Sequence, residues 1–315
     1  MKLYGEQQMI ISCGEALADC FKQQDTHAFD AIIGGSPLNV AIALANAGSK
    51  SALMTNISTD QFGDMHVAHL TKHRVNCDYI TRSEHLSGLM FVQYNPDKSA
   101  SYNFYGHNSA ELNFDHQNLT SSIDHQVTCL HFGSFSLVCG QTAQSFNQII
   151  NTEKKQRVIS VDINIRTAIE PNMQIWESKF QQLMQSAHIL KASSEDLCLL
   201  YNLESFNKHN ALDILQQWDQ AGVCISVITD AENGAYAYHQ GKLIHRDAHE
   251  VTVVDTVGAG DCFMAFFLNK LEQQNVLDIS AISTLSTDQL ENALEAGLKA
   301  AAFTVEQKGA IFPSR

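Results

Sequence analysis

Residues 255–261 of the 315-residue chain read Asp-Thr-Val-Gly-Ala-Gly-Asp. A β-branched run at residues 251–254 precedes this stretch, and an apolar run at residues 262–268 follows it. We expect the first run to be a strand and the second to begin a helix. The glycines would then form a tight turn between a strand and a helix, an arrangement typical of α/β proteins.

The expected turn has the features of an anion site with a carboxylate beside it. Glycines allow the backbone amides of Gly258, Ala259 and Gly260 to approach a ligand, and amides at a helix start have no intrahelical partner. Asp261 would lie in the first turn of the helix, pointing into the same space. A purely structural turn with Asp261 as a cap is the alternative. The chain has no G-x-x-x-x-G-K-[ST] and no G-x-G-x-x-G motif, which argues against P-loop and dinucleotide-binding proteins.

Outward from this turn, short β-rich runs alternate with amphipathic stretches over most of the chain. That alternation predicts an α/β fold with a mainly parallel sheet covered by helices on both faces. The expected strands are residues 9–13, 52–57, 127–132, 158–163, 188–191 and 223–229, and the expected helices are residues 37–47, 62–74, 141–152, 176–185 and 211–221.

Two regions depart from the alternation. No helix is evident over residues 15–33, and residues 88–94 with 101–105 resemble a hairpin turning at Asn95-Pro96-Asp97. We expect these segments to form a small second sheet. Residues 1–315 are therefore interpreted as a single domain with a β lid from about 14–33 and 86–106.

Composition limits the class of function. Hydrophobic residues make up 44% and charged residues 17% of the chain, as in a globular enzyme, and the net charge of -14 argues against a nucleic-acid partner. The eight cysteines include no C-x-x-C pair, and we find neither a signal peptide nor a membrane-spanning run. These features predict a cytoplasmic protein with no membrane partner.

A second glycine cluster lies at residues 33–41, which read Ile-Gly-Gly-Ser-Pro-Leu-Asn-Val-Ala. Pro37 suits the first turn of a helix, and Ser36 is expected to cap it. The structural alternative is a packed strand–helix junction with Asn39 hydrogen-bonded inside it.

The stretch at residues 255–261 resembles the D-T-x-G-A-G-D signature of the PfkB family, the ribokinase-like sugar kinases. The resemblance implies a ribokinase-like three-layer sandwich with a mainly parallel central sheet and a small β-sheet lid. It also implies that Asp261 is the catalytic base and that the amides of Gly258, Ala259 and Gly260 form an anion hole.

Further motifs keep the family's order and imply a sugar site. They resemble G-E-x-L-x-D at residues 14–19, G-G-x-x-x-N at residues 34–39, an F-Y pair at residues 104–105, and D-x-N-x-R at residues 162–166 with Ile163 in place of the usual proline. The substrate-binding residues implied are Asp19, Gly34, Gly35, Asn39, Phe104, Asn164 and Arg166.

The resemblance implies ATP, Mg2+ and a monovalent cation such as K+ as cofactors. Residues 191–196 are similar to K-x-S-E-E-E, and residues 229–234 to T-x-G-x-x-G with Ala231 in place of the first glycine. The implied nucleotide-binding residues are Lys191, Thr229 and Gly234; the implied cation residues are Asp196, through the water shell of Mg2+, and Asp255 and Val257 for the monovalent cation.

The activity expected from the resemblance is ATP-dependent phosphorylation of a primary sugar hydroxyl, with fructokinase the closest pattern. Kinases of 2-keto-3-deoxygluconate or of ribosides, and a non-catalytic sugar-binding relative, are the alternatives. An oxidoreductase is a third interpretation, disfavoured by the missing dinucleotide motif. A homodimer formed through the lid is a further expectation.

Overall fold

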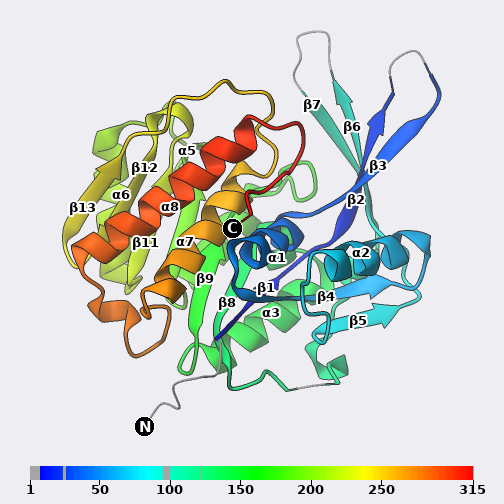
Figure 1. Ribbon diagram of the computed structural model, residues 1–315, viewed down its shortest axis with the longest axis horizontal. Helices are drawn as coiled ribbons and strands as arrows, with labels where there is room; N and C mark the ends of the chain where they lie inside the picture. Colours follow the sequence, from blue (N-terminus) through cyan, green and yellow to red (C-terminus); the bar gives the residue numbers. More distant parts are fainter. Residues whose placement is uncertain (1–7, 24–25, 95–99, 121, 315) are drawn as a thin grey trace.

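The computed structural model describes residues 8–23, 26–94, 100–120 and 122–314. Its main sheet has nine strands in the order β13-β12-β11-β10-β9-β8-β1-β4-β5 (Figure 1). These strands are β1 (Met9–Cys13), β4 (Lys50–Ser58), β5 (Ile80–Ser83), β8 (Val127–Gly133), β9 (Val158–Asp162), β10 (Ile189–Ser193), β11 (Ile225–Thr229), β12 (Ala235–His239) and β13 (Lys242–Arg246).

Helices cover both faces of this sheet, as the sequence predicts. One face is covered by α1 (Ser36–Ala47), α2 (Gln61–Lys72), α7 (Ala259–Gln273) and α8 (Thr287–Val305), and the other by α3 (Gly140–Glu153), α4 (Met173–Met184), α5 (Ser194–Leu200) and α6 (Lys208–Ala221). Short 3-10 turns lie at Ala110–Leu112, His116–Asn118, Ser134–Leu137, Ala231–Asn233 and Ile282–Thr284.

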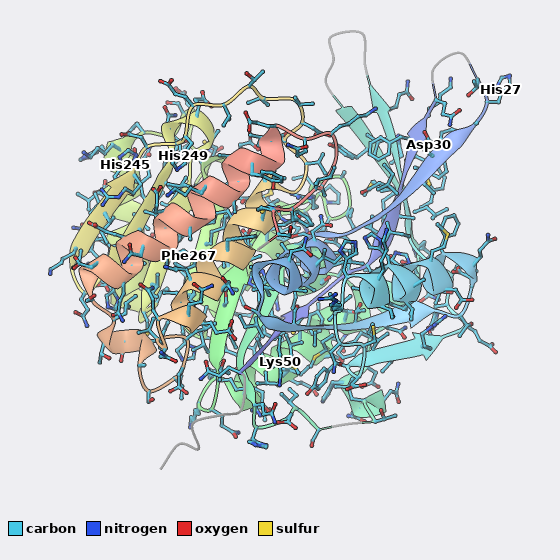
Figure 2. All side chains as sticks on the ribbon, viewed as in Figure 1. His27, Asp30, Lys50, His245, His249 and Phe267 are labelled. Carbon is cyan, nitrogen blue, oxygen red and sulfur yellow. The ribbon has the colours of Figure 1, made fainter. Side chains whose placement is uncertain are left out.

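Apolar residues that alternate along the strands contribute to two separate hydrophobic cores. Ile10 and Ile11 are neighbours on β1, and because successive strand residues point to opposite faces, they belong to different hydrophobic clusters. Phe267 of α7, labelled in Figure 2, is fully buried in the cluster that contains Ile10. The three-layer α/β sandwich expected from the sequence is confirmed.

The order of the strands determines where a ligand site forms. Strands β11, β10, β9, β8, β1, β4 and β5 are parallel, whereas β12 and β13 are antiparallel additions at one edge. The chain runs from β1 to β4 on one side and returns to β8 on the other. In open α/β sheets, ligands bind outside the carboxyl ends of the strands at such a reversal.

A second, four-stranded sheet projects away from the main one (Figure 1). Its order is β3-β2-β6-β7, with β2 (Leu17–Lys22), β3 (Phe29–Gly34), β6 (Leu89–Tyr94) and β7 (Ala100–Tyr105). The predicted hairpin is confirmed by the antiparallel pairing of β6 with β7, while its expected turn at residues 95–97 lies outside the described residues. His27 and Asp30 lie toward the distal end of this sheet (Figure 2).

The strand expected over residues 251–254 is wrong. These residues belong to no strand, and Val253 and Val254 are 61% and 60% exposed. The Val254 amide instead donates to the Val305 carbonyl at 2.7 Å, so the segment runs past the end of α8 rather than into the sheet. The β-branched pattern was misleading because the amides of Val254 and Asp255 both donate to the carbonyl of Val305 at the end of α8. The glycine turn therefore joins a loop, not a strand, to α7.

Candidate active site

The start of α7 requires glycine for its geometry. Gly258 is the N-cap residue and has a left-handed backbone with φ 80°. A Cβ at this position would lie 2.9 Å from the Cβ of Ala310, so a side chain would also displace the C-terminal segment. The Ala259 amide donates to the Thr256 carbonyl at a long 3.3 Å, which closes the turn. Amides in this first helical turn face the space beyond the helix end.

The carboxylate of Asp261 is held by two donors from α1. Ser36 Oγ donates to Asp261 Oδ1 at 2.6 Å, and Asn39 Nδ2 donates to Asp261 Oδ2 at 2.9 Å. Asp261 is only 8% exposed. The two glycine clusters of the sequence, more than 220 residues apart, thus meet at one carboxylate.

The sequence assigned the wrong role to Ser36. The N-cap of α1 is Gly35, and no side chain caps this helix. The hydroxyl of Ser36 donates to the carboxylate of Asp261 instead, because a hydrogen bond to a carboxylate is stronger than one to a neutral amide. Ser36 is therefore a site residue that the motifs did not identify, since its chemistry suits a cap equally well.

A buried ion pair lies beneath the start of α7. Lys191 Nζ donates to Asp162 Oδ2 at 2.7 Å, and both side chains are almost fully buried. A Cβ on Gly260 would lie 3.4 Å from Lys191 Nζ. The structure thus places Lys191 at the glycine turn and gives it an acidic partner, Asp162, that we did not single out from the motif around Asn164 and Arg166.

Asp162 is incompletely satisfied by the described residues. Its Oδ1 atom is buried and has no hydrogen-bond partner among them. Burial raises the pKa of Asp162 to about 6, with Lys191 opposing the shift and the nearby Asp196 and Asp261 adding to it. The unpartnered Oδ1 atom of Asp162 leaves one carboxylate oxygen free to accept from a water molecule or to meet a cation.

Asp196 has a structural role that the sequence did not predict. Its Oδ1 accepts the Ile165 amide at 2.8 Å, and its Oδ2 accepts the amide and hydroxyl of Ser193 in a capping box of α5. Both oxygens are therefore engaged by the protein. This arrangement suits contact with a metal's water shell better than direct coordination, because each oxygen keeps only part of its accepting capacity.

Asp19 of the small sheet faces the same region. Burial raises the pKa of Asp19 to about 6, and the positive charge of Arg166 opposes that rise. Gly34 faces Asp19 so closely that a Cβ on Gly34 would lie 2.8 Å from Asp19 Oδ2. The guanidinium of Arg166 donates to the Ile165 carbonyl at 2.9 Å, and Asn164 before it has a left-handed backbone, φ 43°. The predicted sugar-side residues Asp19, Gly34 and Arg166 thus lie near one another, and Asn164 lies two residues before Arg166 in the chain.

Phe104 of β7 packs at the base of the small sheet. Its ring centroid lies 5.6 Å from that of Phe135, and its atoms would meet a Cβ on Gly106 at 1.9 Å. The glycine leaves room for the ring. Phe104 is thus partly a packing residue, whose exposed part remains available to a ligand.

Glu15 is a second residue that the sequence analysis passed over. It is 2% exposed and accepts a short hydrogen bond from Ser136 Oγ. Burial raises the pKa of Glu15 to about 7, opposed by Ser136, Ser134 and Arg166. A Cβ on Gly35 would lie 2.6 Å from the Glu15 carbonyl, so this turn packs directly on the start of α1. Glu15 is the glutamate of the motif at residues 14–19 that resembles G-E-x-L-x-D, and this motif could have identified it.

The expected nucleotide loop follows β11. Thr229 ends that strand, and Gly234 has φ 90° and leaves no room for a side chain, since a Cβ would meet the Arg246 carbonyl at 2.0 Å. Ala231 replaces the family's first glycine, yet its φ is 43°, in the left-handed region that favours glycine. The loop therefore keeps a glycine-like backbone with alanine in place.

Asp255 connects the turn before α7 to the C-terminal segment. Its Oδ1 accepts the Val257 amide at 3.0 Å, and its Oδ2 accepts the Gly309 amide at 2.9 Å. Val257 is 39% exposed. In the described part of the chain, no group of three or more His, Cys, Asp or Glu side chains is arranged to hold a metal. Any monovalent-cation site here would thus use mainly backbone oxygens.

The fold and the site together are those of a phosphotransferase: a helix start whose amides can bind an anion, a carboxylate beside it and a separate small sheet. Residues 7–315 match the pfkB family carbohydrate kinases, and the chain belongs to this family. The match excludes the oxidoreductase alternative.

Individual relatives agree with this assignment. A fructokinase of Rhizobium leguminosarum bv. trifolii is 31% identical over 287 residues, which cover 90% of this chain and 86% of that protein. The crystal structure of a fructokinase with bound ATP from Xylella fastidiosa has a TM-score of 0.87 and 26% identity, covering 97% of this chain and 94% of the other. A double-mutant fructokinase from Vibrio cholerae, in a fructose-, ADP- and potassium-bound form, has the same fold, with a TM-score of 0.83, 22% identity, and coverage of 96% and 94%.

Proposed function

We propose that the protein transfers the γ-phosphoryl group of ATP to a primary hydroxyl of fructose. The observation that carries this proposal is the carboxylate of Asp261, held by Ser36 and Asn39 at the anion-binding start of α7. The named relatives that are 25% or more identical support fructose as the sugar, since they include fructokinases of bacteria and plants.

Each residue has a part in an in-line transfer. The sugar lies between the main sheet and the small sheet, bound by Asp19, Gly34, Gly35, Asn39, Phe104, Asn164 and Arg166. Asp261 accepts the proton of the attacking hydroxyl, and its two hydrogen bonds fix the carboxylate in place. The amides of Gly258, Ala259 and Gly260 stabilise the charge on the transferred group. The small sheet acts as a lid that excludes water.

The remaining residues serve the nucleotide and its cations. Thr229 and Gly234 border ATP, with Lys191 and its partner Asp162 beneath the phosphates. Asp162, with its orphaned oxygen, and Asp196, through water, would hold Mg2+, which supplies neutralising charge to the phosphates. Asp255 and Val257 border the position of a monovalent cation such as K+.

A panel of sugars in a coupled ADP-release assay tests the proposal. We expect fructose to give the highest kcat/KM among fructose, 2-keto-3-deoxygluconate, aminoimidazole riboside and ribose. If an acid sugar or riboside exceeds fructose by ten-fold or more, the assignment of fructose is wrong and the kinase class stands. If ATP binds and no sugar is phosphorylated, the protein is a non-catalytic relative.

The location and assembly of the protein belong to the same proposal. All eight cysteines are free, which supports a reducing compartment such as the cytoplasm. None of the helices in the described ranges is both long and apolar enough to cross a membrane. A homodimer through the lid is supported by the half-exposed Phe29 and Ile32 on β3, an edge strand. Light scattering of the purified protein tests the assembly.

A further inference from the structure

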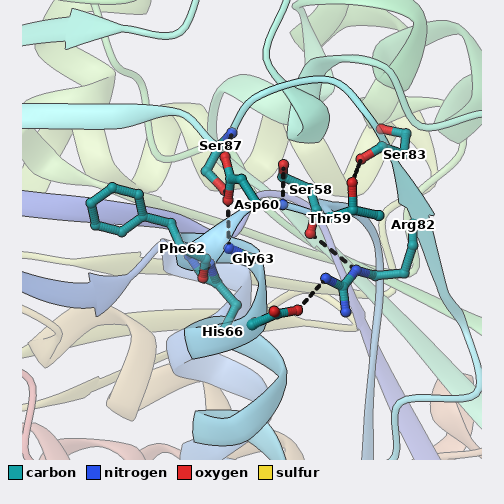
Figure 3. Close-up of polar contacts among 10 residues, drawn as sticks. Ser58, Thr59, Asp60, Phe62, Gly63, His66, Arg82, Ser83 and Ser87 are labelled. Carbon is teal, nitrogen blue, oxygen red and sulfur yellow. Dashed lines mark hydrogen bonds and ion pairs between the residues drawn. The ribbon is translucent and has the colours of Figure 1, made fainter.

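The segment that leads into β6 is attached to the main domain through the carboxyl groups of Asp60 and Glu111. Ser87 donates to Asp60 twice, from its amide to Oδ2 and from its hydroxyl to Oδ1, both at 2.8 Å (Figure 3). The next amide, that of Gly88, donates to Glu111 Oε2 at 3.2 Å. The segment also accepts the Ala110 amide on the Leu86 carbonyl, at 2.8 Å. Hydrogen bonds to Asp60 and to Glu111 thus hold residues 87 and 88 at the point where the chain enters β6.

Asp60 is itself rigidly placed. It is the N-cap of α2, and its Oδ1 accepts the Gly63 amide at 2.8 Å (Figure 3). Its own amide donates to Ser58 Oγ at 3.0 Å. Although burial raises the pKa of Asp60, the hydrogen bonds from Ser87 and Gly63 outweigh it and hold the pKa below its usual value. The charged carboxylate therefore makes strong hydrogen bonds to both α2 and the lid segment.

Residues 87–88 lie at the start of β6, which pairs with the two strands that carry sugar-side residues, β2 with Asp19 and β7 with Phe104. β6 lies in the interior of the small sheet, paired with β2 and with β7. Met90 on β6 is the register partner of both Asp19 on β2 and Phe104 on β7. The Ala18 amide donates to the Gly88 carbonyl at 3.2 Å, so β2 is bonded directly to the anchored residue. A shift of residues 87–88 would therefore move Asp19 and Phe104 together.

We propose that Asp60 is a positioning residue for the sugar site. It holds residues 87–88, the hinge of the lid, and thereby sets the positions of Asp19 and Phe104 relative to Asp261. The proposal rests on the proposed function, in which the sugar lies between the lid and the main sheet. It differs from an ordinary capping role, which would contribute only to the stability of α2. Asp60 touches neither substrate nor cofactor in this proposal; it acts through Ser87.

The variant Asp60→Asn separates the two roles. Asparagine is as good an N-cap as aspartate, and its single oxygen can still accept from Gly63 and from the Ser87 hydroxyl. Its amide nitrogen would replace Oδ2 and face the Ser87 amide, so a donor would meet a donor. Ser87→Ala is the second variant; it removes one of the two bonds from Ser87 and leaves the cap of α2 intact.

Ser286→Ala is the matched control. Ser286 caps α8 by accepting the Gln289 amide at 3.2 Å. α8 packs on α7, and Ser286 follows the end of α7 that is opposite Asp261. Because α7 has 15 residues, these ends are roughly 20 Å apart. This variant removes a cap of similar strength without touching the lid.

Two measurements test the proposal. In steady-state kinetics we expect Asp60→Asn to raise the sugar KM on the order of 10-fold, with Ser87→Ala smaller in effect and the ATP KM within about 2-fold. In hydrogen exchange, which requires no substrate, we expect faster exchange of the β2 and β6 amides in both variants, and no change there in Ser286→Ala.

The outcomes distinguish this proposal from the proposed function. Unchanged lid exchange and a sugar KM within about 2-fold of wild type in both hinge variants would overturn the positioning role. An equal rise in sugar KM in Ser286→Ala would also overturn it, because a general loss of stability would then explain the effect. Faster exchange of the β2 and β6 amides in the two hinge variants, together with a wild-type protein that phosphorylates no sugar, would support the hinge and reject the proposed function.

Discussion

Replacement of Asp261 by asparagine tests the central claim about catalysis. The carboxylate accepts from Ser36 Oγ and Asn39 Nδ2. An asparagine can keep its oxygen toward Asn39 and turn its amide nitrogen toward Ser36, whose hydroxyl can accept instead of donate. Both contacts survive in weaker, neutral form, so Asp261→Asn should fold. What it loses is the capacity to take a proton.

The magnitude follows from these contacts. Two charge-assisted bonds become neutral ones, a loss of about 1 kcal/mol each, offset by removing a negative charge that raises the pKa of the neighbouring Asp162. We therefore expect the free energy of unfolding to change by about 1 kcal/mol or less. Loss of a general base should lower kcat about 10²–10⁴-fold, or roughly 3–5 kcal/mol in the barrier.

The assay is coupled ADP release with fructose, combined with urea unfolding and with calorimetric binding of sugar and ATP. The control is Ser36→Ala, which removes one bond to Asp261 and keeps the base; it should lower kcat about 10-fold at most. A kcat of Asp261→Asn within about 3-fold of wild type, with intact folding, would refute the role of Asp261 as base.

Four further variants test the nucleotide loop, two glycines with positive φ and one buried carboxyl group. Ala231→Gly should leave the ATP KM within about 2-fold of wild type, because the backbone already has φ 43°; a drop of about five-fold or more would contradict this. Gly35→Ala, with φ 117° and a Cβ 2.6 Å from the Glu15 carbonyl, should cost about 2 kcal/mol or more in urea unfolding. Gly222→Ala, with φ 105° and open space, should cost only about 1 kcal/mol; equal losses would show that the contact is unimportant. Burial raises the pKa of Glu111 from 4.5 to about 7, so its stabilising contribution is complete below pH 4.5 and is lost as the pH rises through 7. Glu111→Gln should therefore lose less stability than wild type between pH 5 and pH 8, by up to about 3 kcal/mol in urea unfolding; parallel pH profiles would contradict it.

Patterns in the amino-acid sequence predicted the architecture, which the structure confirms, and supplied the site residues that we propose. Strand and helix periodicities predicted the two-faced sheet because the apolar residues of a buried strand and of an amphipathic helix recur with different periods. The glycine turn at residues 255–261 predicted an anion site with Asp261 in reach, because glycines at a helix start have a local physical meaning. The role of Asp261 as base was implied only by the resemblance to the PfkB signature. Local patterns were less reliable for a loop: residues 251–254 have strand composition, yet they lie beside the end of α8 and form no strand.

The partners of these residues depend on contacts between segments that are far apart in the chain. Ser36 is a good cap by its chemistry, and only the approach of α7 makes it a donor to Asp261 instead. Asp162 is an ordinary strand-end acid until Lys191 and the start of α7 bury it and leave one oxygen without a partner. The anchoring of Ser87 by Asp60 likewise joins residues 27 positions apart. Hydrogen bonds between distant segments depend on the packing of whole elements, and no local spacing in the chain encodes them.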